Sequence, residues 1–342
     1  MNAICKLNPA LGAELIDVDT PNLTPNSVLV EVLFTSICGT DIHIFDWDQW
    51  ASSRMNLPLI IGHELSGKVI EIGSNVKSVN CGDFISAESH VTCGSCLQCS
   101  TGLSHLCNVV KLRGVDFDGC FADFAMIDES SIWVNDSCIS PEIASIQEPF
   151  GNALHSLTYT NVKDEKVIVL GCGPIGLCAI ALCHLFGAEQ IFAVDISEYR
   201  LDLASKMGAT EIINATSDNY SKDIMDMTNG LGVGILLELS GSPIALSEGL
   251  KLVRSGGYVS LLGLPSKNVS LDISNDIILK GLTVQGIFGR ILPKTWEETS
   301  KILTSNKLNL SDLITHQFKL EEFNSAFNLM KTGMCGKIVM SP

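Results

Sequence analysis

The sequence predicts an α/β protein in which a doubly wound parallel sheet interrupts a β-rich domain. Three observations predict this architecture: the length of 342 residues, the short β-like stretches of residues 1–149, and the alternation of strands and helices over residues 150–288. After residue 288 the regular alternation of strands and helices stops, and the sequence there includes the short predicted strand "GKIVM". We therefore expect residues 289–342 to return to the first domain.

The composition of each stretch and the residues that bound it predict the individual elements. "SVLVEVLF" and "LSGKVIEIG" are rich in β-branched residues and are bounded by Gly, Pro and Asn, as strands are. In the second half, "KVIVLG", "QIFAVD", "VGILLELSG", "GGYVSLLG" and "LTVQGIFG" predict strands. Helices are predicted for "SEYRLDLASKMGA", with Ser197 as N-cap and Gly208 as stop, for about 243–254, and for "TWEETSKILTSN".

Charge and termini exclude several classes of partner. The formal net charge is −16 and no run of Lys or Arg stands out, which disfavours nucleic acid and anionic membrane surfaces. The start "MNAICKLNPALG" lacks the features of a signal peptide, so we expect a cytoplasmic protein. Residues 167–187 are long and apolar enough to span a bilayer, but Gly171, Gly173 and Pro174 break them into a strand, a turn and a helix.

The stretch "VIVLGCGPIG" carries a dinucleotide motif. Gly171, Gly173 and Gly176 match G-x-G-x-x-G after a predicted strand and before a predicted helix, where free N–H groups and the helix dipole favour a pyrophosphate. Asp195 ends the next strand at the spacing expected for a carboxylate that binds the ribose hydroxyls, which favours NAD over NADP. Arg200 leaves NADP open, because a nearby arginine can accept a 2′-phosphate; it can equally be a surface residue of the helix.

Four cysteines crowd into "CGSCLQCSTGLSHLC". Cys93, Cys96, Cys99 and Cys107 have the spacing C-x2-C-x2-C-x7-C, which suits a closed tetrahedral zinc site of structural type. An iron–sulfur cluster, free core thiols or a disulfide pair are the alternatives. The total of thirteen cysteines is odd, which argues against a disulfide framework.

A second, sparser group comprises Cys38 in "ICGTDIH" and His63 with Glu64 in "IIGHELSG". Sulfur, imidazole and carboxylate together suit a catalytic zinc with an open position. Taken singly, each residue also has an ordinary explanation: a buried Cys is usually a core residue, a lone His is usually a hydrogen-bonded polar residue, and adjacent His-Glu pairs are common. Such a zinc would bind a substrate hydroxyl and lower its pKa.

These motifs resemble those of the zinc-dependent medium-chain dehydrogenases over nearly the whole chain. The resemblance rests on "GHELSGKVIEIG", the 93–107 cysteines, "GCGPIG", "ICGTDIHIFDWDQW", "EPFGNALHSL", "GIFGR" and "ITHQF". It implies a GroES-like catalytic zinc domain, a Rossmann NAD-binding domain, one catalytic and one structural Zn²⁺ per chain, and a homotetramer. "QEPFGN" has no cysteine where simple alcohol dehydrogenases place one, so the chain is similar to the polyol and threonine branch.

The resemblance also implies roles for individual residues. Cys38, His63 and Glu64 surround the catalytic zinc, Glu148 lies beside the metal, and Thr40 and His43 relay the hydroxyl proton to solvent, whereas Asp41 fixes local structure. The residues implied near the nicotinamide are Ile175, Leu262, Gly263, Leu264, Ile287 and Phe288.

The implied substrate is L-threonine, oxidised to 2-amino-3-oxobutanoate. A zwitterion needs charged partners, and Arg290, at the predicted seam between domains, is the candidate for its carboxylate, with an interdomain salt bridge as the alternative. His90 is a second candidate, and Glu148 or an acidic residue of "DWDQW" the candidate for the ammonium. The carboxylate role predicts that Arg290→Ala damages threonine turnover but spares uncharged diols.

Three further expectations complete the functional prediction. A polyol or vicinal-diol dehydrogenase of the same family is the alternative activity. A non-catalytic NAD- and zinc-binding redox sensor is the alternative from another class, suggested by the cysteines outside the metal sets, such as Cys172. Because the product is labile, a downstream ligase partner is expected by family analogy.

Overall fold

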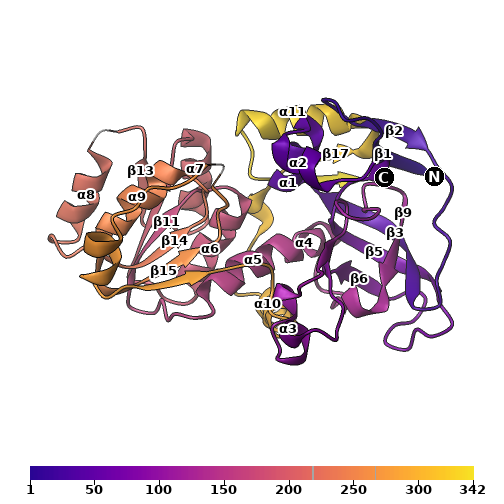
Figure 1. Ribbon diagram of the computed structural model, residues 1–342, viewed down its shortest axis with the longest axis horizontal. Coiled ribbons are helices and arrows are strands. Elements are labelled where there is room, and N and C mark those ends of the chain that lie inside the picture. Colours follow the sequence, from indigo (N-terminus) through magenta and orange to yellow (C-terminus); the bar gives the residue numbers. More distant parts are fainter. Residues whose placement is uncertain (218, 266) are drawn as a thin grey trace.

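The second half of the chain builds a parallel sheet, seen at the left of Figure 1 in a computed structural model that describes residues 1–217, 219–265 and 267–342. Its strand order is β13-β12-β11-β14-β15-β16, and all neighbouring pairs are parallel. The bounds are β11 (Lys166–Leu170), β12 (Gln190–Asp195), β13 (Glu211–Asn214), β14 (Val233–Glu238), β15 (Val253–Leu261) and β16 (Thr283–Gly286). The order reverses between β11 and β14, which opens a crevice at the carboxyl ends of these strands.

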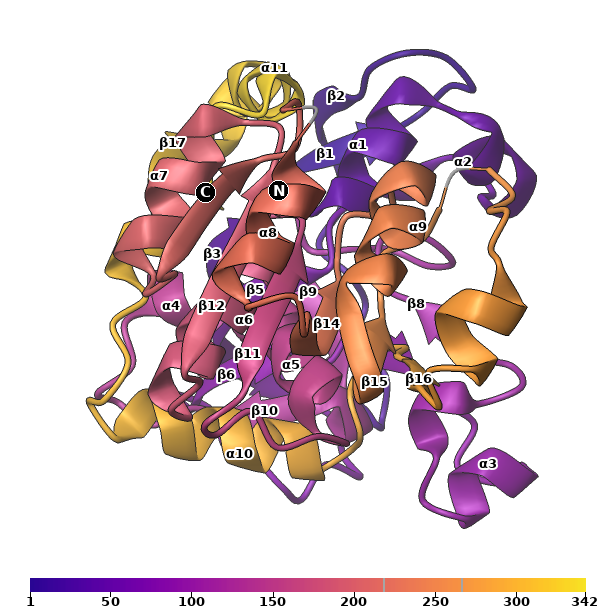
Figure 2. The same cartoon turned by 90° about the vertical axis from the view of Figure 1, so that its left-hand side faces the viewer.

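Helices cover both faces of this sheet, as Figure 2 shows. They are α5 (Gln147–Leu157), α6 (Pro174–Leu185), α7 (Glu198–Lys206), α8 (Tyr220–Met227) and α9 (Pro243–Leu252). Successive side chains of a strand point to opposite faces. Accordingly, Val167 and Val169 of β11 join the core under α5, α6 and α7, whereas Ile168 and Leu170 join the core under α8 and α9.

The residues before α5 and those after β16 together form a β-rich part with several short helices. β1 (Asn2–Lys6), β2 (Glu14–Asp17) and β4 (Leu59–Ile60) form one small sheet. The larger sheet contains β3 (Ser27–Ser36), β5 (Glu64–Ile72), β6 (Phe84–Ala87), β9 (Phe124–Asp128), β10 (Ile132–Val134), β17 (Ile314–Lys319) and β18 (Lys337–Ser341), and β7 (His90–Val91) pairs separately with β8 (Lys111–Leu112). The helices are α1 (Gly39–Asp46), α2 (Gln49–Arg54), α3 (Leu97–Ser100), α4 (Pro141–Ser145), α10 (Lys294–Thr304) and α11 (Phe323–Thr332).

The C-terminal strand lies in the sheet of the N-terminal half. β18 pairs antiparallel with β3 through Val339 and Ser36, and parallel with β17. This pairing brings residues near the C-terminus next to α1 and β5. The domain boundaries at residues 149/150 and 288/289 stay a prediction.

The predicted elements compare well with the observed ones. Ser197 accepts the N–H of Arg200 as the N-cap of α7, and the helix ends at Lys206, two residues before Gly208, which has a φ of +105°. Residues 167–187 divide into β11 and α6, as the glycines predicted. Among the described residues, no helix is long and apolar enough to cross a membrane. The α/β fold class is confirmed.

Candidate active site and metal centres

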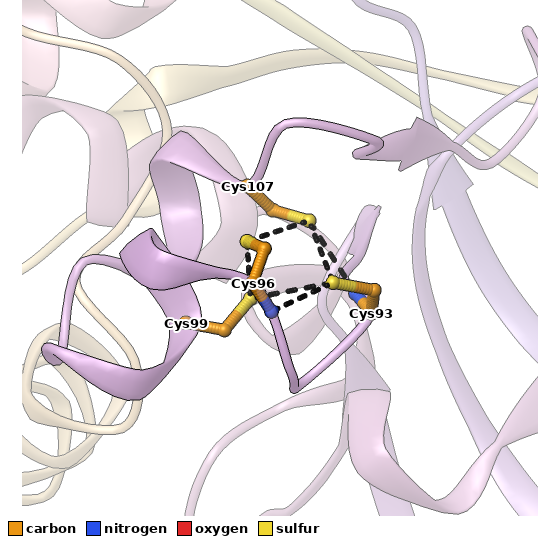
Figure 3. Close-up of side chains that lie close together, drawn as sticks. All are labelled: Cys93, Cys96, Cys99 and Cys107. Carbon is orange, nitrogen blue, oxygen red and sulfur yellow. Dashed lines mark hydrogen bonds between the residues drawn. The ribbon is translucent and has the colours of Figure 1, made fainter.

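The side chains of the four clustered cysteines point toward one another (Figure 3). They belong to residues 93–107, a lobe around α3 at the edge of the molecule (Figure 2). Their sulfur atoms all lie within 4.8 Å of one another. The Sγ–Sγ distances are 3.6 Å for Cys93–Cys107 and Cys96–Cys99, 3.9 Å for Cys96–Cys107 and 4.0 Å for Cys93–Cys99. The local chain alone, residues 93–107, builds this arrangement.

This geometry fits a single tetrahedral zinc ion. With Zn–S bonds of about 2.3 Å, the sulfurs of a tetrahedron stand about 3.8 Å apart. An iron–sulfur cluster divides its thiolates among several irons and holds them farther apart, so the spacing favours zinc over that alternative. The N–H groups of Ser95 and Cys96 hold the pKa of Cys93 down to about 6, which favours the thiolate that a metal needs.

The second group of candidate ligands lies where α1 and β5 begin, in the β-rich part of the molecule. Cys38 is the residue before α1, and His63 and Glu64 stand at the start of β5. The structure brings one ligand atom of each within 4.8 Å of the others. His63 and Glu64 are buried and Cys38 is partly exposed, so the set is open on one side only. These donors fit a catalytic zinc that keeps a position for substrate.

Asp41 supports this group from behind. Its Oδ2 accepts the N–H of Cys38 at 2.8 Å, and its Oδ1 lies 3.6 Å from Nδ1 of His63. Burial raises the pKa of Asp41 to about 6, while His63 and the Cys38 N–H act in the opposite direction. A carboxylate behind a metal-binding imidazole orients its ring and raises its basicity. The prediction that Asp41 fixes local structure agrees with these contacts.

Glu64 is held on one side by Lys337. Nζ of Lys337 lies 2.5 Å from Oε2 of Glu64 and donates to the carbonyl of Ile37 at 2.9 Å. The hydroxyl of Ser36 also donates to Oε2. The other oxygen, Oε1, is buried and has no hydrogen-bond partner among the described residues, so it is available to a metal.

Thr40 and His43 lie three residues apart on α1 and so share one face of the helix. Oγ1 of Thr40 is 3.8 Å from the sulfur of Cys38. His43 is exposed, and its Nδ1 lies 2.7 Å from Oδ2 of Asp48. The helix thus leads from the candidate metal ligands to solvent, as a proton relay requires.

Arg290 is enclosed by acceptors. Its guanidinium donates to both carboxylate oxygens of Glu88, to Oε1 of Glu148 (2.6 Å), to Ser89 (2.8 Å) and to Asn152 (3.1 Å), and lies 2.7 Å from Nδ1 of His90. All five N–H groups of an arginine are engaged in this way. Against the effect of burial, Arg290 holds the pKa of Glu88 and of Glu148 below the usual range.

These contacts favour a salt bridge over the substrate-carboxylate role predicted for Arg290. Glu88, Glu148 and Arg290 all fall in the predicted domain of residues 1–149 and 289–342, so this bridge differs from the interdomain bridge given as the alternative, although the bond to Asn152 crosses the predicted boundary. A substrate carboxylate would have to displace Glu88 or Glu148 to reach the guanidinium. Glu88, His90 and Glu148 also resemble a metal-binding group by proximity. The guanidinium fills the space between their oxygens, so this third group does not fit a metal.

The glycine loop has the form that a pyrophosphate needs. Gly171 adopts a φ of +92°, and a Cβ at Gly176 would stand 1.9 Å from the carbonyl oxygen of Gly171. A Cβ at Gly173 would meet nothing within 4 Å, so this glycine faces open space just before Pro174 begins α6. The loop thus fits a phosphate at a helix N-terminus.

Asp195 lies beside this loop, and its carboxylate accepts the N–H of Cys172 at 2.7 Å and of Ser197 at 2.9 Å. Nε of Arg200 is buried without a partner among the described residues. Ile287 is buried, and Phe288 lies edge-on to His90 with ring centroids 5.1 Å apart. The structure places the remaining predicted cofactor residues, Ile175, Leu262, Gly263 and Leu264, at the start of α6 and just after β15.

Sequence reasoning missed two charged residues of the site, Glu88 and Lys337, and it did not pair Asp48 with His43. Glu88 stands two residues before His90 in "AESHVTC", and Lys337 lies in "GKIVM". Glu88 contacts the nearby His90, but its charged partner Arg290 lies 202 residues away, and Lys337 donates to the carbonyl of Ile37, 300 residues away, so neither motif carries a local signal for these partners. The pairing of Asp48 with His43 could have been predicted, since the two residues lie five positions apart.

Comparison with known proteins identifies the family. Residues 24–136 match the alcohol dehydrogenase GroES-like domain, and residues 174–305 match the zinc-binding dehydrogenase domain. The chain is 45% identical to L-threonine 3-dehydrogenase of Bacillus licheniformis (100% of this chain, 99% of the relative) and 45% identical to that of Pyrococcus abyssi (99% and 98%). The solved structure of 2R,3R-butanediol dehydrogenase from Bacillus subtilis has the same fold, with a TM-score of 0.89 at 24% identity over 100% of this chain and 99% of that one. The resemblance is confirmed: the chain belongs to the zinc-binding alcohol dehydrogenase family and is an enzyme of that family.

Proposed function

We propose that this protein oxidises the β-hydroxyl of L-threonine with NAD, giving 2-amino-3-oxobutanoate, NADH and a proton. The observation that carries the proposal is the buried charge beside the candidate metal ligands. Glu88 and Glu148 contribute two negative charges, and Arg290 neutralises one. The surplus negative charge, with Glu148 close enough to His63 to affect its titration, favours an ammonium group near the reacting carbon.

Glu148 is the proposed partner of the ammonium group. The acidic residues of "DWDQW" are otherwise engaged: Asp46 pairs with Lys331 at 2.6 Å, and Asp48 with His43. His90 is the proposed partner of the substrate carboxylate, because Arg290 has no free N–H. Both residues belong to the same buried cluster.

The chemistry divides between the bound groups and the chain. Zinc held by Cys38, His63 and Glu64 would supply a Lewis acid that lowers the pKa of the substrate hydroxyl. Thr40 accepts the hydroxyl proton and passes it toward His43, which releases it to solvent. Gly171, Gly173 and Gly176 orient the cofactor so that the nicotinamide lies near Ile287 and Phe288, where the hydride leaves the substrate carbon.

NAD is favoured over NADP by the electrostatics of the adenosine end. The Asp195 carboxylate would accept hydrogen bonds from two ribose hydroxyls and repel a 2′-phosphate. Arg200 lies close to this carboxylate in sequence and would contact the adenosine side of the cofactor. Asp195 therefore decides the preference.

We also propose two zinc ions per chain and four subunits per assembly. The two cysteine-containing groups each fit one zinc ion. β16 is an edge strand, and near it Val284, Ile278 and Leu279 expose apolar side chains, as expected for a surface covered by a second copy. A cytoplasmic location and a downstream ligase that removes the labile product remain predictions.

The test is NADH formation by zinc-loaded protein with L-threonine, 2,3-butanediol and sorbitol at equal concentration. We expect a clear preference for threonine, and Glu148→Gln should lower threonine turnover more than diol turnover. Activity on the diols alone would replace the proposal by the diol dehydrogenase alternative.

No turnover of any substrate would favour the redox-sensor alternative. Against that alternative, burial raises the pKa of Cys178 and Cys183 to about 12 and that of Cys172 still further, so these thiols are poorly reactive.

A further inference from the structure

The proposed proton relay ends at His43, and the structure gives this imidazole a carboxylate partner. We propose that Asp48 is a positioning residue of the relay, which holds His43 by Nδ1 and leaves Nε2 as the nitrogen that takes the proton. This inference deepens the proposed function and rests on it, because it concerns how the substrate proton leaves the site.

The chain between the two residues fixes their geometry. α1 ends at Asp46, and Trp47 adopts a left-handed conformation with a φ of 54°, which reverses the chain. Asp48 is then the N-cap of α2: its Oδ1 accepts the N–H of Ala51 at 3.0 Å. The other oxygen, Oδ2, lies 2.7 Å from Nδ1 of His43. Because the cap bond fixes the carboxylate, Oδ2 is held in place for the imidazole.

A carboxylate at this position selects one tautomer of the imidazole. An ionised carboxylate only accepts hydrogen bonds, so Nδ1 of a neutral His43 carries the hydrogen and Nε2 carries the free lone pair. Although burial raises the pKa of Asp48, the Ala51 N–H and His43 together hold it below its usual value, which keeps the acceptor ionised. Trp50 limits the ring from another side, with centroids 6.2 Å apart at 60°.

The other charges on the surrounding elements have partners of their own. Asp41 is buried and faces His63. Asp46 pairs with Lys331 of α11, and Arg54 of α2 pairs with Asp116. Among the described residues, Asp48 is therefore the carboxylate that governs His43, which exposes 59% of its side chain and so reaches solvent.

The test uses three variants of the full-length, zinc-loaded enzyme. Asp48→Ser keeps an N-cap hydroxyl for α2 but is too short to reach His43. Asp48→Asn keeps the cap and the size, and removes the charge. Asp46→Ser is the matched control, because it removes a carboxylate from the same stretch without touching His43.

The first readout does not depend on activity. It is the rate at which diethylpyrocarbonate modifies His43 at one fixed pH, followed by mass spectrometry of its peptide. We expect this rate to rise about two-fold or more in Asp48→Ser, because the Asp48 carboxylate no longer covers Nδ1, and to stay unchanged in Asp46→Ser.

The second readout is the pH profile of kcat/KM on the substrate that the enzyme turns over best. Its acidic limb should move to lower pH in both Asp48 variants and stay in place in Asp46→Ser. The plateau should fall several-fold in both Asp48 variants. In Asp48→Ser the ring is free, and in Asp48→Asn the single amide oxygen keeps the cap, so that the NH2 group faces Nδ1 and cannot accept from it. An unchanged modification rate of His43 in Asp48→Ser, an unmoved acidic limb, or an equal change in Asp46→Ser would overturn the inference. Inactivity toward threonine would overturn only the proposed substrate, because the modification rates are measured without it.

Discussion

The two candidate metal centres are built in opposite ways. The four-cysteine centre lies within 15 consecutive residues, from Cys93 to Cys107, on an exposed lobe, and its only donors are sulfurs. The centre at Cys38, His63 and Glu64 draws on the start of α1 and the start of β5, and it is buried among charged residues. The first centre closes a short loop, whereas the second depends on the whole fold.

The surroundings of the second centre explain why it can be reactive. Asp41 lies behind His63, and Lys337 holds one oxygen of Glu64 while the other is unpartnered. Next to this centre, Arg290 pairs with Glu88 and Glu148, and all three side chains are buried. Buried charges of this kind are costly to maintain and do not add stability on balance, so their presence points to function.

The largest expected effect separates the two centres directly. Cys38→Ser removes a ligand of the buried centre, and we expect kcat/KM to fall by at least ~10⁴-fold, because a metal ion contributes several kcal/mol to such reactions. The four-cysteine lobe should keep its zinc, so atomic absorption should give about one zinc per chain instead of two. Cys81→Ser is the control, since this thiol is exposed and donates to the carbonyl of Ile70, away from both centres. Retention of both zinc ions in Cys38→Ser would contradict the ligand assignment.

The next effect concerns the buried bridge. Arg290→Ala leaves two buried carboxylates without their counter-charge, and we expect a loss of about 3–5 kcal/mol in the free energy of unfolding, measured by urea titration. The matched control is Arg254→Ala, which breaks an exposed pair with Glu165 (2.8 Å) and should cost at most about 1 kcal/mol.

The same variant revises the expectation drawn from the sequence alone. If Arg290 is a bridge, turnover of threonine and of diols should fall together. A loss confined to threonine would restore the carboxylate-binding role.

The same difference between a local centre and a centre that depends on the whole fold decides which parts of the site the sequence could predict. The cysteine lobe, the glycine loop and the G-H-E motif were predictable, because each is a short stretch whose spacing determines its geometry. The partners of Glu64 and Arg290 were not predictable. The pairing of β18 with β3 brings Lys337 to Glu64, and Glu88 lies 202 residues before Arg290 in the chain. Local spacing carries no signal for such contacts.

Arg290 shows the cost of reasoning from residue type alone. A guanidinium near the nicotinamide suggested a carboxylate partner, and that part of the reasoning was sound, since the residue does bind carboxylates. The sequence could not indicate that Glu88 and Glu148 already supply them. The fold class was predictable because the alternation of strands and helices extends over more than a hundred residues.

A smaller effect tests the support behind the buried centre. Asp41→Asn keeps the acceptor for the Cys38 N–H but removes the charge beside His63, and we expect zinc affinity at this centre to fall by about 10–100-fold. Competition with a chromophoric chelator measures it. The four-cysteine centre of the same sample is the internal control and should release its zinc at the wild-type rate; parallel losses at both centres would indicate general destabilisation instead.

The smallest effect concerns the contact between the cysteine lobe and the body of the protein. His105, on the lobe, lies edge-on to His155 of α5, with ring centroids 5.3 Å apart, and Nδ1 of His155 lies 2.7 Å from the carbonyl oxygen of Gly289. Burial lowers the pKa of His155. Below its usual pKa of about 6.5 the unfolded chain therefore binds a proton that the folded protein does not, and stability must fall as the pH falls.

His155→Asn isolates this contribution, because its amide can donate to Gly289 in place of the imidazole and does not titrate. Between pH 7.5 and 5.5, the free energy of unfolding of the wild type should fall more than that of the variant. The difference should be at most about 1.4 kcal/mol, which is the free energy of binding one proton to the unfolded chain alone at one pH unit below 6.5. Urea titrations at the two pH values measure the difference, and His105, present in both proteins, cancels from it. Equal pH dependence in the two proteins would mean that His155 accepts a proton without leaving its place, so that the lobe and the body are joined by packing and not by a neutral imidazole.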